Sequence, residues 1–101
     1  LSRGRRGTMY YTYILASGKH GTLYIGVTNN IRQRLELHRS GHGSEFVKKY
    51  EVHRLVHLEE HPTAEDAIRR EKQLKKWNRD WKIRLIEAEN PDWSDRSDFL
   101  T

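Results

Sequence analysis

Two tyrosines, an arginine, a histidine and a glutamate have the side chains best suited to chemistry in this sequence: Tyr13, Tyr24, Arg34, His38 and Glu71. A carboxylate binds a divalent cation, and an arginine stabilises the charge that develops when water attacks a phosphate. A phenol or an imidazole handles the proton of that water. If the five side chains share one cleft, the set suits hydrolysis of a phosphodiester. Residue types alone do not establish this, because polar residues in a small basic protein often converge by chance.

Glu71 departs most from ordinary packing. It falls near the middle of the apolar arc of a helix predicted over residues 63–77, among Ala64, Ala67, Ile68 and Leu74. A buried carboxylate without a partner is costly, so Glu71 is expected to meet a cation, a metal ion or several donors. Two alternatives need no catalysis: the carboxylate reaches water at the edge of the face, or it forms a structural ion pair with Arg34. The residue alone does not decide between them.

A hairpin followed by a helix is predicted to position the other four side chains. Strands at residues 10–16 and 22–27 flank a turn rich in glycine. Tyr13 and Tyr24 project to the same face if residues opposite each other in the hairpin have numbers that sum to an odd value. Tyrosines at such positions are more often ordinary packing residues, and that interpretation stays open.

The helix is expected to run from Ile31 to about Arg39, after a polar N-cap segment at residues 28–30. Arg34 and His38 are four residues apart, beside the apolar positions of this helix. They should therefore point toward the hairpin.

The remainder of the chain predicts a polar loop at 41–50, a third strand at 52–58 and helices at 63–77 and 79–89. Thr63 and Asp66 resemble a capping box, and Asn78 is expected to end one helix and cap the next. The acidic segment after Asn90-Pro91, with Trp93 and Phe99, is expected to pack loosely. The order β-β-α-β-α-α fits an α+β class in which helices cover a three-stranded sheet.

Composition predicts one small domain with a modest core, because 101 residues are 35% hydrophobic. There is no cysteine, which excludes a disulfide framework and a thiolate zinc site. No apolar run approaches a membrane span, and a cytoplasmic protein is expected. Residues 1–8 are expected to be a disordered arm or an expression remnant. The fold is assigned to 9–89, followed by an acidic tail at 90–101.

Charge is distributed unevenly along the chain. Residues 9–86 carry fifteen Lys and Arg against nine Asp and Glu, whereas residues 87–101 carry five acids against Arg96 alone. A basic body suggests a polyanionic partner, since phosphate contacts release condensed counterions. Solvated helical faces explain the same pattern equally well. If the partner is a nucleic acid, the expected contacts are Lys48, Lys49, Lys72, Lys75, Lys76 and Arg79.

The motif residues resemble the GIY-YIG nuclease family, in particular its small stand-alone bacterial members. The second family triplet is present as Tyr24-Ile25-Gly26, and the first appears as Tyr11-Thr12-Tyr13, which keeps the tyrosine but not the glycine and isoleucine. The family's helical arginine and histidine match Arg34 and His38, and its glutamate matches Glu71. Its late asparagine has Asn78 as a counterpart. The resemblance covers residues 9–95.

The resemblance implies a three-stranded antiparallel sheet flanked by helices, and phosphodiester cleavage with one divalent ion, Mg²⁺ or Mn²⁺. Glu71 would bind the metal and Arg34 would contact the scissile phosphate. Tyr13, Tyr24 and His38 would position or deprotonate the attacking water, and the choice of base stays open. A free phenol has a pKa near 10, so it would need help at neutral pH.

Three functions are consistent with these residues. The first is a metal-dependent DNA endonuclease, structure-selective or weakly specific, acting in DNA repair or recombination. The second is a nucleic-acid-binding module with weak or no turnover. The third is a structural or partner-binding domain in which Glu71 and Arg34 form an internal ion pair. The expected partner is DNA, and no association with a membrane is expected. The oligomeric state is open.

Overall fold

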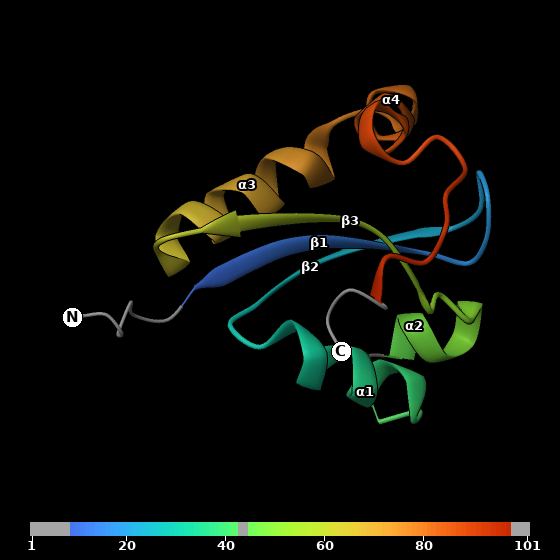
Figure 1. Ribbon diagram of the computed structural model, residues 1–101, viewed down its shortest axis with the longest axis horizontal. Coiled ribbons are helices and arrows are strands. Elements are labelled where there is room, and N and C mark those ends of the chain that lie inside the picture. Colours follow the sequence, from blue (N-terminus) through green and yellow to red (C-terminus); the bar gives the residue numbers. More distant parts are fainter. Residues whose placement is uncertain (1–8, 43–44, 98–101) are drawn as a thin grey trace.

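The computed structural model describes residues 9–42 and 45–97. Their elements are β1 (Tyr10–Ala16), β2 (Leu23–Thr28), α1 (Ile31–Arg39), α2 (Glu45–Tyr50), β3 (Arg54–His61), α3 (Ala64–Lys76) and α4 (Arg79–Glu89). The strands form one antiparallel sheet in the order β2-β1-β3. In Figure 1, α3 and α4 cover one face of the sheet and α1 and α2 the other. The predicted α+β fold is confirmed. The arm predicted at residues 1–8 lies outside the described ranges, as does Phe99.

The central strand β1 is buried on both faces because it contributes to two cores. Successive side chains of a strand point to opposite faces, so Tyr13 and Leu15 face one way and Ile14 and Ala16 the other. The first core adds residues from α1, from α2 and from around β3: Ile31, Leu35, Val47, Val52 and Leu55. The second adds residues from the other two strands, the other helix pair and the C-terminal segment: Ile25, Val56, Leu74, Ile86 and Trp93. No helix of the described residues has the length and apolar character needed to cross a membrane.

The hairpin register decides which residues share the α1 face. Tyr13 pairs with Gly26 and Leu15 pairs with Tyr24. Opposite residue numbers therefore sum to an odd value, and the condition for placing Tyr13 and Tyr24 on one face is met.

The predicted helix starts are confirmed at α3 and α4. Thr63 Oγ1 accepts a hydrogen bond from the backbone N–H of Asp66 at 3.1 Å. Asn78 Oδ1 accepts from the backbone N–H of Trp81 at 2.9 Å. Each bond satisfies a backbone donor that the helix itself leaves free.

Two elements differ from the prediction. The segment predicted as a polar loop contains α2, whose Val47 is fully buried in the first core. The third strand runs over Arg54–His61 instead of residues 52–58. Its pairing with β1 shifts register between Ile14 and Leu15, so three successive residues, Leu55, Val56 and His57, are all buried. This irregularity breaks the alternation from which the strand was predicted.

The expectation of a loosely packed C-terminal segment is wrong for residues 90–97. Trp93 is fully buried, and its indole N–H donates to Glu87 at 2.8 Å. Asn90 Nδ2 donates to the carbonyl of Val56 at 3.1 Å, and the backbone N–H of Arg96 donates to the carbonyl of Leu55 at 2.8 Å. The segment therefore lies against β3, held by a large aromatic anchor and backbone hydrogen bonds.

The apolar face of α3 is also narrower than its sequence pattern indicates. Ala67 and Leu74 are buried, but Ile68 is 42% exposed. The buried side of α3 is thus centred away from Ile68, which lies at the surface.

Candidate active site

A buried tyrosine–histidine pair forms the centre of the candidate site. Tyr13 from β1 is 0% exposed and His38, in the last turn of α1, is 2% exposed. The Tyr13 phenol oxygen lies 3.1 Å from His38 Nε2. The ring of Tyr24, from β2, lies 6.3 Å from that of Tyr13 and 5.4 Å from that of His38, measured between centroids. Three of the five predicted residues are therefore in one aromatic cluster.

Gly26 makes room for the Tyr13 phenol. A Cβ built on Gly26 would lie 2.5 Å from the Tyr13 hydroxyl oxygen and 2.6 Å from Cζ. Real side chains do not approach so closely, and both contacts involve a ring that is itself tightly packed. The glycine of the Tyr24-Ile25-Gly26 triplet thus has a steric role that spacing alone did not indicate.

Arg34 and Glu71 also lie within electrostatic reach of Tyr13. Burial raises the pKa of the Tyr13 phenol to about 12, with further increases from Tyr24 and Glu71, while Arg34 opposes them by charge and hydrogen bonding. Glu71 comes from α3, on the opposite face of the sheet (Figure 1). Tyr24 and His38 therefore lie directly beside Tyr13, while Arg34 and Glu71 are close enough for their charges to shift the pKa of its phenol.

His38 is held in its neutral form. Burial lowers its pKa below the usual value, and the charges of Arg34 and His53 lower it further. The Tyr13 hydroxyl and His38 Nε2 share a hydrogen bond whose direction depends on the tautomer of the neutral imidazole. The other ring nitrogen, Nδ1, is buried and has no hydrogen-bond partner in the described part of the chain.

Glu71 does not form the ion pair considered from the sequence. Its carboxylate accepts from Lys75 Nζ at 2.9 Å, one helical turn away, and not from Arg34. The side chain is 19% exposed, so it is partly buried yet open to solvent. Within residues 9–42 and 45–97, no group of three His, Asp or Glu side chains could enclose a metal ion. A lone carboxylate suits a hard divalent ion that keeps most of its water ligands, as Mg²⁺ does.

The residues predicted to bind nucleic acid are distributed over both faces of the sheet. Lys48 and Lys49 lie on α2, whereas the other predicted lysines are exposed on α3: Lys72, Lys75 and Lys76. Arg79 is engaged within the molecule, since its guanidinium donates to the carbonyls of His20 and Gly21 at 2.6 and 2.7 Å. It ties the hairpin turn to α4, a contact that the sequence did not indicate.

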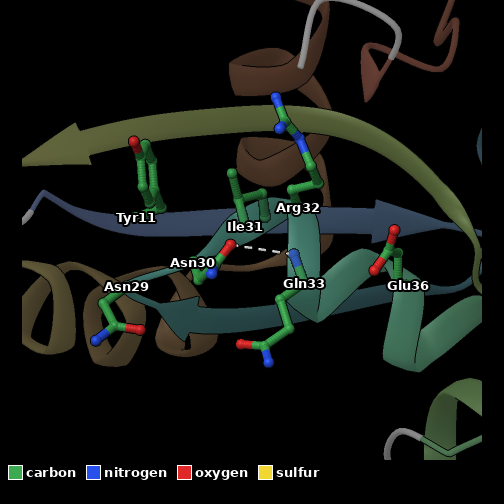
Figure 2. Close-up of a pocket in the computed structure, with 7 residues that line it drawn as sticks. All are labelled: Tyr11, Asn29, Asn30, Ile31, Arg32, Gln33 and Glu36. Carbon is green, nitrogen blue, oxygen red and sulfur yellow. Dashed lines mark hydrogen bonds between the residues drawn. The ribbon is translucent and has the colours of Figure 1, made fainter. Parts of the chain in front are cut away.

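A pocket of about 390 Å³ lies at the start of α1 (Figure 2). Its lining combines polar groups of the β2–α1 turn with one strand residue and the first turns of α1: Tyr11, Asn29, Asn30, Ile31, Arg32, Gln33 and Glu36. Asn30 Oδ1 accepts from the backbone N–H of Gln33 at 3.1 Å and caps the helix. None of the five candidate residues lines this pocket, although it borders the turn of α1 that carries Arg34.

A polar network beside Glu71 was also missed. Arg70 donates to both carboxylate oxygens of Glu59 at 2.9 and 3.1 Å and lies 5.1 Å from the Trp77 ring centroid. His57 Nε2 lies 2.8 Å from the same carboxylate. Although burial disfavours the charge, hydrogen bonds from His57 and Arg70 lower the pKa of Glu59 to about 2. The network holds α3 to β3 at the residue before Glu71.

Comparison with known proteins agrees with this geometry. Residues 9–84 match the model of the GIY-YIG catalytic domain, and the chain belongs to the GIY-YIG family. It is 41% identical over 83 residues to a UPF0213 protein of Syntrophus aciditrophicus, covering 81% of this chain and 93% of that protein. It is 33% identical to a UPF0213 protein of Staphylococcus haemolyticus, covering 77% and 94%.

A solved structure supports the same conclusion about the fold. The solution NMR structure of a UPF0213 protein from Bacillus halodurans superposes with a TM-score of 0.55 at 29% sequence identity. The match covers 92% of this chain and 98% of that one. The two chains therefore share the fold over most of their length.

Proposed function

We propose that this protein is a metal-dependent endonuclease that hydrolyses phosphodiester bonds in DNA, with structure-selective or weak sequence specificity. The observation that carries the proposal is the gathering of Tyr24, Arg34, His38 and Glu71 around the buried phenol of Tyr13. Membership of a nuclease family supports it. The proposed setting is DNA repair or recombination in the cytoplasm.

Arg34 is proposed to bind the scissile phosphate. It is half-buried, and it makes no ion pair within the described residues, so its charge is not neutralised by a carboxylate. A fixed guanidinium stabilises negative charge on phosphate oxygens most effectively where water is partly excluded. The Arg34 charge lowers the pKa of His38 and opposes the rise in the pKa of Tyr13, which supports a position beside both rings.

Tyr24 is proposed to contact the attacking water. Tyr13 and His38 are proposed to hold Tyr24 in place. Tyr13 is fully buried and its hydroxyl is already hydrogen-bonded to His38. Its proposed role is therefore to orient His38 and Tyr24. Tyr24 is only half-buried, and its ring packs against those of Tyr13 and His38. A divalent ion on Glu71, Mg²⁺ or Mn²⁺, would supply Lewis-acid stabilisation of the phosphate and lower the pKa of bound water.

The decisive experiment measures cleavage of labelled duplex, flap, branched and single-stranded DNA with Mg²⁺, Mn²⁺ or EDTA. Glu71→Gln removes the ligand charge and should abolish cutting. Glu65→Gln, which changes another carboxylate of α3, should leave cutting intact. Cutting in EDTA, or undiminished cutting by Glu71→Gln, would contradict the mechanism. Salt-sensitive binding without cleavage by the wild type would instead identify a nucleic-acid-binding module.

A further inference from the structure

Helix α2 presents two aromatic rings to solvent beside the candidate site. Phe46 is 41% exposed and Tyr50 is 43% exposed, and their ring centroids are 4.8 Å apart. The Phe46 ring lies 5.9 Å from that of Tyr24, which in turn lies 5.4 Å from His38. A continuous row of rings therefore leads from the buried cluster to the surface.

Positive charge accompanies these rings. Lys48 and Lys49 are exposed on the same helix, and Lys49 Nζ lies 5.3 Å from the Tyr50 ring centroid. Exposed aromatic rings interleaved with lysines are the chemistry that binds single-stranded nucleic acid, since bases stack on the rings and phosphates contact the ammonium groups. In a duplex the base faces are already stacked on one another, so a duplex would contact α2 only through its phosphates.

We propose that Phe46, Tyr50, Lys48 and Lys49, here the α2 platform, bind unpaired bases of the DNA next to the scissile phosphate. The site then prefers single-stranded or locally unpaired DNA. This inference rests on the proposed function for the identity of the ligand. A second copy of the chain is a poorer occupant, because it would bring the same two lysines against each other.

Binding measured in EDTA tests the platform without cleavage. Fluorescence anisotropy of the full chain with a labelled single strand and with the matched duplex compares the two ligands. Phe46→Ala and Tyr50→Ala should each weaken single-strand binding about tenfold and change duplex binding by less than about twofold. Phe46→Trp should retain binding. Ile68→Ala, which truncates an equally exposed residue on α3 at the other face of the sheet, should change neither.

A base analogue reports stacking directly. Fluorescence of 2-aminopurine in the single strand should be quenched by the wild type and by Ile68→Ala, and much less by Phe46→Ala. Lys48→Ala should weaken both single-strand and duplex binding. Equal losses for the two DNAs in the ring variants, no loss in either, or no single-strand binding by the wild type would overturn the proposal. If the wild type stacks bases but cuts no DNA, the proposed nuclease function is wrong and the proposed α2 platform is retained.

Discussion

Two polar clusters treat ionisable groups in opposite ways. Between α3 and β3, the Glu59 carboxylate accepts from Arg70 and lies beside His57, and its pKa falls to about 2. On the α1 face of the sheet, the pKa of Tyr13 rises to about 12, and His38 keeps a buried ring nitrogen with no partner in the described residues. The first cluster pairs its charged groups with one another, whereas the second shifts the pKa values of Tyr13 and His38 toward their neutral forms.

The difference separates groups that stabilise the fold from groups available for chemistry. A satisfied ion pair fixes a helix to a strand but has no capacity left for a ligand. Groups with shifted pKa values and incomplete hydrogen bonding are typical of functional sites. Glu71 follows Arg70 of the first cluster along α3, and its charge contributes to the raised pKa of Tyr13 in the second.

The largest expected effect is on cleavage. Arg34→Ala should lower the cleavage rate about 100- to 1000-fold, because it removes the positive charge closest to the proposed phosphate position. The melting temperature should fall only slightly, since Arg34 makes no ion pair among the described residues and its loss removes a hydrogen bond to Tyr13. Arg32→Ala, an exposed arginine of the same helix, is the matched control. Equal cleavage by the two variants would remove Arg34 from the proposed mechanism.

The next effect is on stability. Glu59→Gln should lower the free energy of unfolding by about 3 kcal/mol, because Arg70 and His57 lose their charged partner. Urea denaturation measures the change. Glu60→Gln, at the exposed neighbouring position of β3, should change stability by less than about 0.5 kcal/mol. If the two variants lose the same stability, the network does not hold α3 to β3.

Gly26→Ala should destabilise by about 1–3 kcal/mol, because the added methyl group overlaps the Tyr13 phenol. The molecules of Gly26→Ala that do fold should also cleave DNA more slowly than the wild type, since the Tyr13 phenol must move away from His38. Gly18→Ala is the control, because a Cβ at Gly18 meets nothing within 4 Å. Cleavage by folded Gly26→Ala at the wild-type rate would show that the position of the phenol does not matter.

The smallest expected effect is on the pH dependence of stability, which should differ between the two clusters. Both His38 and Glu59 have pKa values lower in the folded chain than in the unfolded chain, so both favour folding at higher pH and lose that contribution on acidification. The His38 contribution should decline below pH 6.5 and that of Glu59 only below pH 4.5, toward pH 2. Urea denaturation across pH should lack the first decline in His38→Gln and the second in Glu59→Gln. A single decline common to both variants would contradict the assignment.

Local patterns predicted most of the fold. The hairpin, α3, α4 and the Asn78 cap each depend on a short run of residues with a clear period or capping side chain. Helix α2 has only six residues, which is too short for a helical period to be recognised in the sequence. Trp93 was missed because it packs against strand residues far away in the sequence, such as Ile14 and Val56, which the acidic composition of its own segment does not indicate.

The candidate site was predictable to the same extent. Side-chain chemistry and the family resemblance identified the five residues, and their roles stay predictions; the structure places Tyr13, Tyr24 and His38 in one cluster. Their partners depend on three-dimensional packing, and so the sequence did not indicate the Glu71–Lys75 pair or the steric role of Gly26. The aromatic row from Tyr24 to Tyr50 was missed together with α2.

The C-terminal segment has a consequence for self-association. With the order β2-β1-β3, the outer side of β3 is an open sheet edge, which invites pairing with a strand of another molecule. The backbone N–H of Arg96 and the side chains of Asn90 and Asp95 bond to Leu55 and Val56 along that edge. Residues 90–97 therefore cover part of this edge and oppose aggregation through strand pairing between molecules. A chain shortened before Asn90 should aggregate under conditions in which its sheet is still folded.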